Sequence, residues 1–257
     1  MAKEDKILFT IVTVTYNSKE TLEPTIKSVA MQDYKNYEYL VIDGGSTDGT
    51  QDIIKKYENN INTWVSERDE GIYDAMNKAT RMAKGEWILF LNSGDLFVSH
   101  NILSTLAIHM QDCEYDVIYG DILIDSNGDR ITKEADEPCN MHRMYFCHQS
   151  AFVRTKILKE MPFDTRFKMS ADLHFFKRCY TNGLSFFHLH EPLVFYDRNG
   201  ISNTNRVAGL LDNVRVIKDL DKGDEKFIFL LRLYFVIYRI KISSIFKKKK
   251  SLERENS

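Results

Sequence analysis

The chain has 257 residues, long enough for one α/β domain with a sizeable core, and its 43% hydrophobic and 28% charged residues are those of an ordinary globular protein. The formal net charge of −2 gives no global reason to expect binding to nucleic acid or to a membrane. That average hides a basic tail, because residues 226–257 contain nine Lys or Arg and two acids, which leaves +7 on the tail and −9 on the rest.

The first 98 residues show strands that alternate with helices. Apolar runs rich in β-branched residues predict the strands, and apolar positions at helical spacing predict the helices. The predicted strands are 7–14, 37–43, 61–67 and 87–91, and the predicted helices are 18–32, 51–59 and 71–85.

The second half is less regular. Residues 115–134 predict a strand and a hairpin around an Asn-Gly turn, and residues 170–183 predict a helix closed by Gly183. Residues 184–196 predict strands around Pro192. A basic, apolar helix is predicted from Lys226, and its longest uninterrupted apolar run is six residues, far below the roughly 20 that span a bilayer.

The alternation of strands and helices predicts an α/β fold with a mostly parallel sheet covered on both faces. Ligands of such sheets bind beyond the carboxyl ends of the strands, near a switch in strand order. Polar clusters stand at three predicted strand ends, residues 15–17, 43–48 and 92–95. One polar turn is ordinary, but three at successive strand ends favour a binding site.

The cysteines and the N-terminal residues indicate the cellular compartment in which the protein is expected. The four cysteines have no CxxC pair or regular spacing, and the first ten residues lack the apolar stretch of a signal peptide, so a cytoplasmic setting is expected. Two cysteines and two histidines lie close together in CNMHRMYFCH, residues 139–148. Their spacing fits neither a zinc finger nor a zinc ribbon, so structural or pocket-lining roles are expected.

Five motifs, TVTYN, VIDGGSTDGT, DEGIYDAMNKA, FLNSGD and SADLHFF, follow one another in an order that resembles the family 2 glycosyltransferases. Within them the chain is similar to bacterial enzymes that build surface polysaccharides such as O-antigen and colanic acid. The resemblance runs from about Phe9 to Ser202. It implies the GT-A fold, which is Rossmann-like, and a hexosyltransferase-type (EC 2.4) activity that moves a sugar from a nucleotide-diphosphate donor with inversion.

The resemblance also implies a division of the chain. Residues 7–205 are expected to form the GT-A domain, with a nucleotide-sugar-binding half at 7–98 and an acceptor-binding half at 99–205. Residues 206–257 are expected to form a helical, basic tail.

A divalent cation, Mn²⁺ or Mg²⁺, is expected because charge builds on the phosphate oxygens as the donor diphosphate leaves. These cations prefer a few carboxylates plus substrate phosphates. By resemblance, Asp95 is the metal-binding acid of an Asp-x-Asp-like motif. Asn92 stands where an Asp is common and can bind the cation through its carbonyl oxygen. Ser93 and Gly94 of the same turn are expected to contact the donor.

The resemblance assigns the nucleotide contacts as well. Asp43 matches the acid that contacts the base, and since a carboxylate can accept from the N3–H of uracil, a UDP-sugar is favoured. Tyr16 can pack along the base. Asp48 either binds the ribose or caps the helix that starts near Thr50, and Asn77 either faces the donor or is an exposed polar position. The other expected donor contacts are Thr15, Asn17 and Asp69.

Inversion requires one base on the acceptor side, and Asp172 matches the family's catalytic acid. The alternative for Asp172 is a first-turn helix residue stabilised by the helix dipole. His148 and Gln149 are expected to line the acceptor cleft, unless His148 is a buried structural residue. Arg198 is expected to contact the diphosphate or to form a surface ion pair. Related enzymes often have a metal-ligand His where this chain has Asn199, so no third protein ligand is assigned.

The composition of the basic tail suggests where the acceptor is located. Large apolar side chains and the cluster Lys247–Lys250 suit the interface of an anionic leaflet, where a lipid-linked oligosaccharide would be presented. This would place the protein at the cytoplasmic face of the inner membrane. The alternative is a helix packed on the body with a solvated Lys end.

A second class of function is a nucleotide-sugar-binding partner without turnover in a polysaccharide assembly complex. Asn92 and Asn199 favour it, whereas the presence of both Asp95 and Asp172 argues for an enzyme. A sugar-phosphate nucleotidyltransferase would need a Gly-rich loop after the first strand, and TYNSKET contains no glycine.

Overall fold

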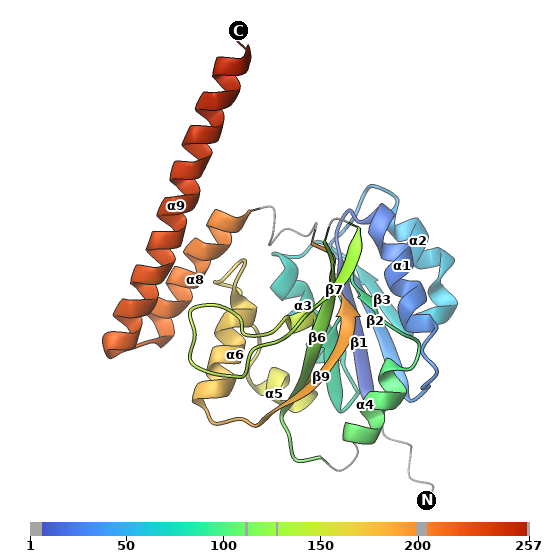
Figure 1. Ribbon diagram of the computed structural model, residues 1–257. Coiled ribbons are helices and arrows are strands. Elements are labelled where there is room, and N and C mark those ends of the chain that lie inside the picture. Colours follow the sequence, from blue (N-terminus) through green and yellow to red (C-terminus); the bar gives the residue numbers. More distant parts are fainter. Residues whose placement is uncertain (1–6, 111–112, 127, 199–204, 256–257) are drawn as a thin grey trace, which may run out of the picture.

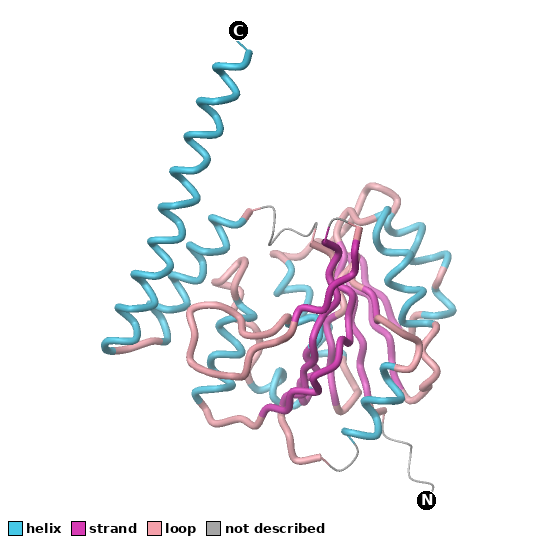
Figure 2. Tube along the Cα trace, in the orientation of Figure 1, coloured by secondary structure: helices cyan, strands magenta, loops and turns pink. Residues whose placement is uncertain are grey.

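The centre of the molecule is one nine-stranded sheet with the strand order β3-β2-β1-β4-β8-β6-β9-β5, and β7 pairs with β6 (Figures 1 and 2). The computed structural model describes residues 7–110, 113–126, 128–198 and 205–255, with side chains described up to residue 243. The strands are β1 Phe9–Thr15, β2 Tyr37–Asp43, β3 Thr63–Ser66, β4 Trp87–Phe90, β5 Leu96–Phe97, β6 Val117–Ser126, β7 Asp129–Lys133, β8 Ala151–Arg154 and β9 Phe186–Phe195.

The four strands predicted in the first half are confirmed to within a few residues, and they run parallel. From β1 the chain first builds outward through β2 and β3, and β4 then pairs with the other side of β1. Strand order therefore switches between β1 and β4. The carboxyl ends of these two strands flank the position where open α/β sheets bind ligands.

Helices cover both faces of the sheet. One apolar core packs α3, α5 and α6 against one face, and a second packs α1, α2 and α4 against the other. β1 contributes to both, because Ile11 enters the second core and Val12 enters the first. The helices are α1 Lys19–Ala30, α2 Thr50–Lys56, α3 Ile72–Met82, α4 Ile102–Met110, α5 Thr155–Glu160, α6 Ala171–Thr181, α8 Arg206–Leu220 and α9 Gly223–Glu255, with short 3₁₀ turns η1 Glu58–Asn60 and η2 His148–Ser150.

Two predicted helices are shorter than expected. The helix over 51–59 ends at Lys56 and is followed by η1, and the helix over 71–85 ends at Met82. Gly85 instead packs against β1, where an added Cβ would lie 2.5 Å from the carbonyl carbon of Phe9. A close backbone approach, and not a helix end, accounts for this glycine.

The second half adds strands of both directions. The predicted hairpin is confirmed as β6 and β7, and residues 184–196 form one long strand, β9, that contains Pro192. Strands β5 and β8 and helices α4 and α5 were not predicted, whereas α8 lies in the tail, residues 206–257, that was expected to be helical. α6 begins at Ala171 and agrees with the predicted helix.

The C-terminal helices α8 and α9 pack against each other, and α9 extends well beyond the body (Figure 1). Phe229, Leu233 and Ile237 of α9 bury against Val214 and Ile217 of α8. In the part of the chain that the structure describes, none of the helices combines the length and apolarity needed to cross a membrane.

A buried ion pair fastens the helical tail to the body. Lys177 on α6 lies 3.1 Å from Asp221, which connects α8 and α9, and both side chains are almost fully buried. Lys177 also donates to the Met141 carbonyl oxygen and lies over the Phe229 ring. The base of α9 is thereby held against the segment that precedes η2.

Candidate functional site

The three predicted polar clusters converge at the carboxyl end of the sheet. The backbone N–H of Gly44 donates to the carbonyl oxygen of Thr15, and that of Ser93 donates to Val14. These bonds join the turns after β1, β2 and β4. The Thr15 hydroxyl is buried and has no hydrogen-bond partner among the described residues, which leaves a polar atom for a ligand at this edge.

Tyr16 and Asp69 lie together over Gly44. A Cβ added to Gly44 would stand 2.6 Å from Asp69 Oδ2 and 3.3 Å from Tyr16 Cδ2. The Tyr16 side chain is 63% exposed, so its ring offers an open apolar face. Two residues expected in the donor site, 53 positions apart, are thus neighbours, and Gly44 between them was not predicted.

Asn17 and Asp48 tie the two adjacent turns together. The Asn17 carbonyl oxygen accepts from the Thr47 N–H, and the Asn17 N–H donates to the Ser46 hydroxyl. The Asp48 carboxylate accepts from the N–H groups of Lys19 and Thr50. Hydrogen bonding, with the Thr50 hydroxyl first, lowers the pKa of Asp48. Asp48 thus bonds Thr50, the first residue of α2, although the N-cap position itself is Gly49.

Asp43 is fully buried at the end of β2. Its carboxylate accepts from the Ser46 hydroxyl and N–H and from the Ser66 hydroxyl at 2.6 Å. The carboxylate thereby fixes the turn that follows β2. Ser46 and Ser66 thus occupy the carboxylate that was expected to contact the base.

The Asn77 side chain is hydrogen-bonded to the backbone of Phe163. Its side-chain N–H donates to the Phe163 carbonyl oxygen at 2.8 Å, and its carbonyl oxygen accepts from the Phe163 N–H at 3.0 Å. The side chain is buried, not exposed, and its amide pins α3 to the segment before α6. We therefore leave Asn77 out of the donor site proposed below.

Asp95, which follows β4, lies beside Asp197, which follows β9. Asp95 is only 3% exposed, and its Oδ1 accepts from the Asp197 N–H at 2.9 Å. The Asp197 carboxylate packs on Gly94, where an added Cβ would lie 2.9 Å from Asp197 Oδ2. Gly94 has φ of +104°, and its N–H donates to Thr25. Asp197 was not predicted as a site residue, although it lies two positions before Asn199, where related enzymes often have a metal-ligand His.

The remaining residues that the sequence predicted for the site lie apart from Asp95 or outside the described residues. The Ser93 hydroxyl lies 3.1 Å from the Thr21 hydroxyl, on the α1 side of the turn. Arg198 is exposed. Asn199 lies outside the described residues, as does the side-chain cluster Lys247–Lys250.

The oxygen atoms after β4 fit a divalent cation. Asn92 Oδ1 is buried and has no hydrogen-bond partner among the described residues. Burial raises the pKa of Asp95 from 3.8 to about 7, and the nearby Asp197 charge adds to this rise. A buried carboxylate with a second one beside it is stabilised by a bound cation. Carboxylate and amide oxygens are ligands that Mg²⁺ and Mn²⁺ prefer.

Asp172 faces a cavity on the other side of η2. The cavity has a volume of about 460 Å³, and its lining includes His148, Gln149 and Asp172. His148 Nδ1 lies 3.1 Å from Asp172 Oδ2, and the Tyr73 hydroxyl donates to Asp172 Oδ1 at 2.9 Å. Burial raises the pKa of Asp172, but the hydrogen bonds with His148 and Tyr73 outweigh burial and hold it below the ordinary value. Tyr73 was not predicted.

The 3₁₀ turn η2 connects the cavity to the acidic pair. The second ring nitrogen of His148, Nε2, lies 3.5 Å from the Asn92 amide nitrogen. Gln149 hydrogen-bonds Asp95 and so helps to lower its pKa against burial. Consecutive residues of one turn thus contact the candidate cation ligands and the candidate base.

A mostly parallel α/β sheet with oxygen ligands at its switch point and a carboxylate-lined cavity beside them is the arrangement of a GT-A-like glycosyltransferase. The sequence profile of Glycosyl transferase family 2 matches residues 10–181, and the chain belongs to this family.

Known proteins similar to the chain agree with this assignment. It is 31% identical over 204 residues to "PGL/p-HBAD biosynthesis glycosyltransferase" of Mycobacterium bovis (strain BCG / Pasteur 1173P2), which covers 77% of this chain and 80% of the relative. The structure of S. aureus TarS 1-349 in complex with UDP-GlcNAc superposes with a TM-score of 0.67 at 22% identity, over 88% of this chain and 71% of TarS 1-349.

A third similar protein is the mannosyltransferase PcManGT from Pyrobaculum calidifontis, in complex with GDP-Man and Mn²⁺. Its TM-score is 0.66 at 17% identity, over 89% of this chain and 69% of the other. The two likenesses to solved structures establish the fold.

The raised pKa of Asp95 generates a pH-dependent prediction. Because its folded pKa, about 7, lies above 3.8, Asp95 contributes stability at low pH that is lost as pH rises to about 7. In metal-free buffer we expect Asp95→Asn to raise the melting temperature by several degrees at pH 8 and by less at pH 5. Asp52→Asn, exposed on α2, is the matched control for loss of one carboxylate. An equal difference at both pH values would contradict the account.

Proposed function

We propose that the protein transfers a sugar from a nucleotide-diphosphate donor, with a UDP-sugar favoured, to a hydroxyl of a lipid-linked glycan in surface polysaccharide biosynthesis. The observation that carries this proposal is the pairing of the oxygen ligands after β4 with the cavity that contains Asp172, joined through η2. The resemblance to enzymes for O-antigen and colanic acid suggests the same kind of product.

Two similar solved structures and the residues near the ends of β1 and β3 support a nucleotide-sugar donor. The TarS structure holds UDP-GlcNAc, and the PcManGT structure holds GDP-Man with Mn²⁺. In this chain the exposed Tyr16 ring would stack on the base, and the buried Thr15 hydroxyl and Asp69 carboxylate would contact the nucleoside. Residues 7–98 would then form the donor half and residues 99–205 the acceptor half.

Asp95, Asn92 and Asp197 would hold the cation. A bound Mn²⁺ or Mg²⁺ supplies charge stabilisation for the departing diphosphate. The residues themselves supply a rigid, partly dry setting, because Asp95 is fixed by the Asp197 N–H and by Gln149.

Asp172 would accept the proton of the attacking hydroxyl. Its Oδ1 is oriented by Tyr73 and its Oδ2 by His148, so the carboxylate cannot rotate away from the cavity. The lowered pKa keeps the carboxylate ionised at neutral pH and therefore ready to accept. Inversion needs no protein acid to protonate the leaving group, since a bound cation would stabilise the charge of the departing diphosphate.

Replacement of the base tests turnover separately from binding. We expect Asp172→Asn to lower kcat by about 10²–10⁴-fold, the range for a positioned general base, while the thermal shift with UDP stays that of the wild type. Tyr73→Phe should lower kcat less, because the carboxylate remains. Full activity in Asp172→Asn would remove the base assignment. Binding of nucleotide without turnover by the wild type, across UDP-sugars and glycan acceptors, would favour the non-catalytic alternative.

The outward face of α9 would dock on an anionic membrane. Side chains three or four positions apart form an exposed apolar stripe on the side of α9 that faces away from α8, and the tail carries +7. Apolar side chains with flanking basic residues suit the interface of anionic lipids. The stripe consists of Phe227, Ile228, Leu231, Tyr234, Phe235 and Tyr238.

Charge introduced into the stripe tests membrane docking. We expect Leu231→Glu/Phe235→Glu to weaken co-sedimentation with phosphatidylglycerol vesicles by more than about tenfold, because each side chain buries apolar surface worth about 1.5–3 kcal/mol. Ile108→Glu, at a 77% exposed position of α4, is the matched control. Equal binding of all three proteins, or a dimer in solution that the double variant abolishes, would contradict docking by this face.

A further inference from the structure

Strand β9 bulges where it passes Gly120 of β6. His188 pairs with Tyr119, whereas Pro192 pairs with Asp121, so three residues of β9 stand opposite Gly120. Space at Gly120 is needed for this, since an added Cβ would lie 2.6 Å from the Glu191 carbonyl oxygen. The bulge therefore depends on a glycine in the neighbouring strand.

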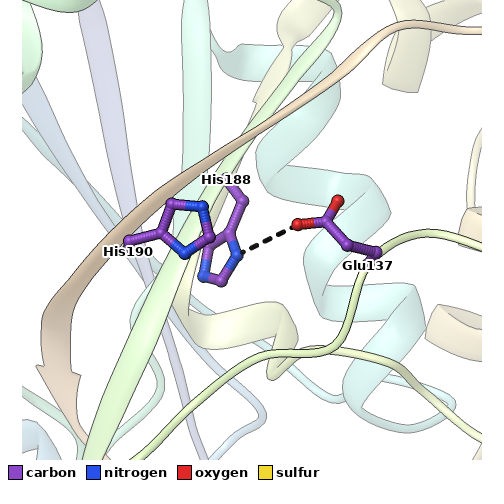
Figure 3. A group of neighbouring side chains, drawn as sticks. All are labelled: Glu137, His188 and His190. Carbon is purple, nitrogen blue, oxygen red and sulfur yellow. Dashed lines mark ion pairs between the residues drawn. The ribbon is translucent and has the colours of Figure 1, made fainter.

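The bulge brings two histidines together. Residues two apart on a regular strand are separated by about 6.6 Å, but the rings of His188 and His190 lie with their centroids 3.8 Å apart (Figure 3). His190 has φ of +55°, a left-handed conformation that few residues other than glycine adopt. Such strained conformations cluster at binding and active sites.

His188 is held with one ring nitrogen available. Its side chain is only 5% exposed, its ring stacks on Tyr119, and its Nε2 lies 2.8 Å from Asp121 Oδ1. With Nε2–H donating to Asp121, Nδ1 presents a lone pair. Nδ1 is buried and has no hydrogen-bond partner among the described residues, and it lies 3.5 Å from Glu137 Oε1 (Figure 3).

We propose that His188, His190 and Glu137 bind a zinc ion. Ligand atoms of the three residues all lie within 4.8 Å of one another. Two imidazoles and one carboxylate are a zinc ligand set that leaves a fourth position for water. The Asp121 carboxylate supplies the outer contact that orients a metal-binding histidine. The Glu137 side chain is 73% exposed, so its carboxylate, which hydrogen-bonds the Tyr119 hydroxyl, can adjust to the ion.

The zinc site is chemically distinct from the oxygen site at Asp95. Nitrogen ligands select zinc and other late transition metals, whereas Mg²⁺ and Mn²⁺ prefer oxygen ligands. Glu137 belongs to the segment between β7 and η2, and residues 134–136 and 143–147 of that segment line the 460 Å³ cavity. The ion would fasten this wall of the cavity to β6 and β9. Zinc would therefore order the acceptor side without touching the donor.

The test is metal binding by tag-free, full-length protein stripped with chelator and titrated with Zn²⁺ in a calorimeter. We expect one equivalent to bind with micromolar or tighter affinity. His190→Ala and Glu137→Gln, both at exposed positions, should weaken binding by more than about 100-fold and tenfold respectively, since outer-contact losses alone cost about 10–100-fold. His100→Ala, an exposed histidine elsewhere, should bind as the wild type does.

Three results would overturn the proposal. They are no zinc binding by the wild type, wild-type affinity in His190→Ala, and loss of binding in Cys139→Ser with His190→Ala unaffected, which would move the ion to the cysteine-rich stretch. Co²⁺ in place of Zn²⁺ gives a second readout, because the absorption of the wild-type complex should show tetrahedral coordination that His190→Ala lacks. Circular dichroism of each metal-free variant checks the fold.

Discussion

Only 3% of Asp95 is exposed, and the site is arranged around the cost of burying that carboxylate. The Asp197 N–H and Gln149 lower its pKa, yet burial dominates and raises it to about 7. A second carboxylate beside Gly94 makes the same region favourable for a cation, as does the Asn92 oxygen, which has no hydrogen-bond partner within the described part of the chain. In the metal-free protein, the burial of these carboxylates costs free energy that a bound divalent cation would offset. The cation would in turn attract a diphosphate.

The turn η2 connects the proposed donor and acceptor sites. His148 contacts Asp172 through one ring nitrogen and approaches Asn92 with the other, and Gln149 bonds Asp95. A bound cation that moved the Asn92 amide would therefore disturb His148, the partner of the proposed base. The proposed zinc ion would act on the same cavity from its far wall, through the segment that leads into η2.

The sequence predicted the parts of the site that depend on local pattern. Apolar runs and their polar ends placed the turns after β1, β2 and β4 at one edge, because carboxyl ends of parallel strands meet there. It missed Asp197, which reaches Asp95 across 102 residues, and Tyr73, which reaches Asp172 across 99. Such contacts depend on strand order in the irregular second half, which no periodicity encodes. The contact between the His188 and His190 rings could not be predicted either, since the bulge that brings them together depends on a glycine in another strand.

The central claim is that nucleotide and cation bind together at the end of β4. The most direct measurement is thermal unfolding with UDP, GDP, TDP and CMP, each with and without Mn²⁺. A ligand at a hundred times its dissociation constant stabilises a fold by about 2.7 kcal/mol, which is a shift of several degrees for a chain of this size. The account predicts a shift with UDP that requires Mn²⁺ and is lost in Asp95→Asn. The absence of a shift with every nucleotide would contradict it. A UDP shift that is the same with and without Mn²⁺ would exclude the cation from the proposed site.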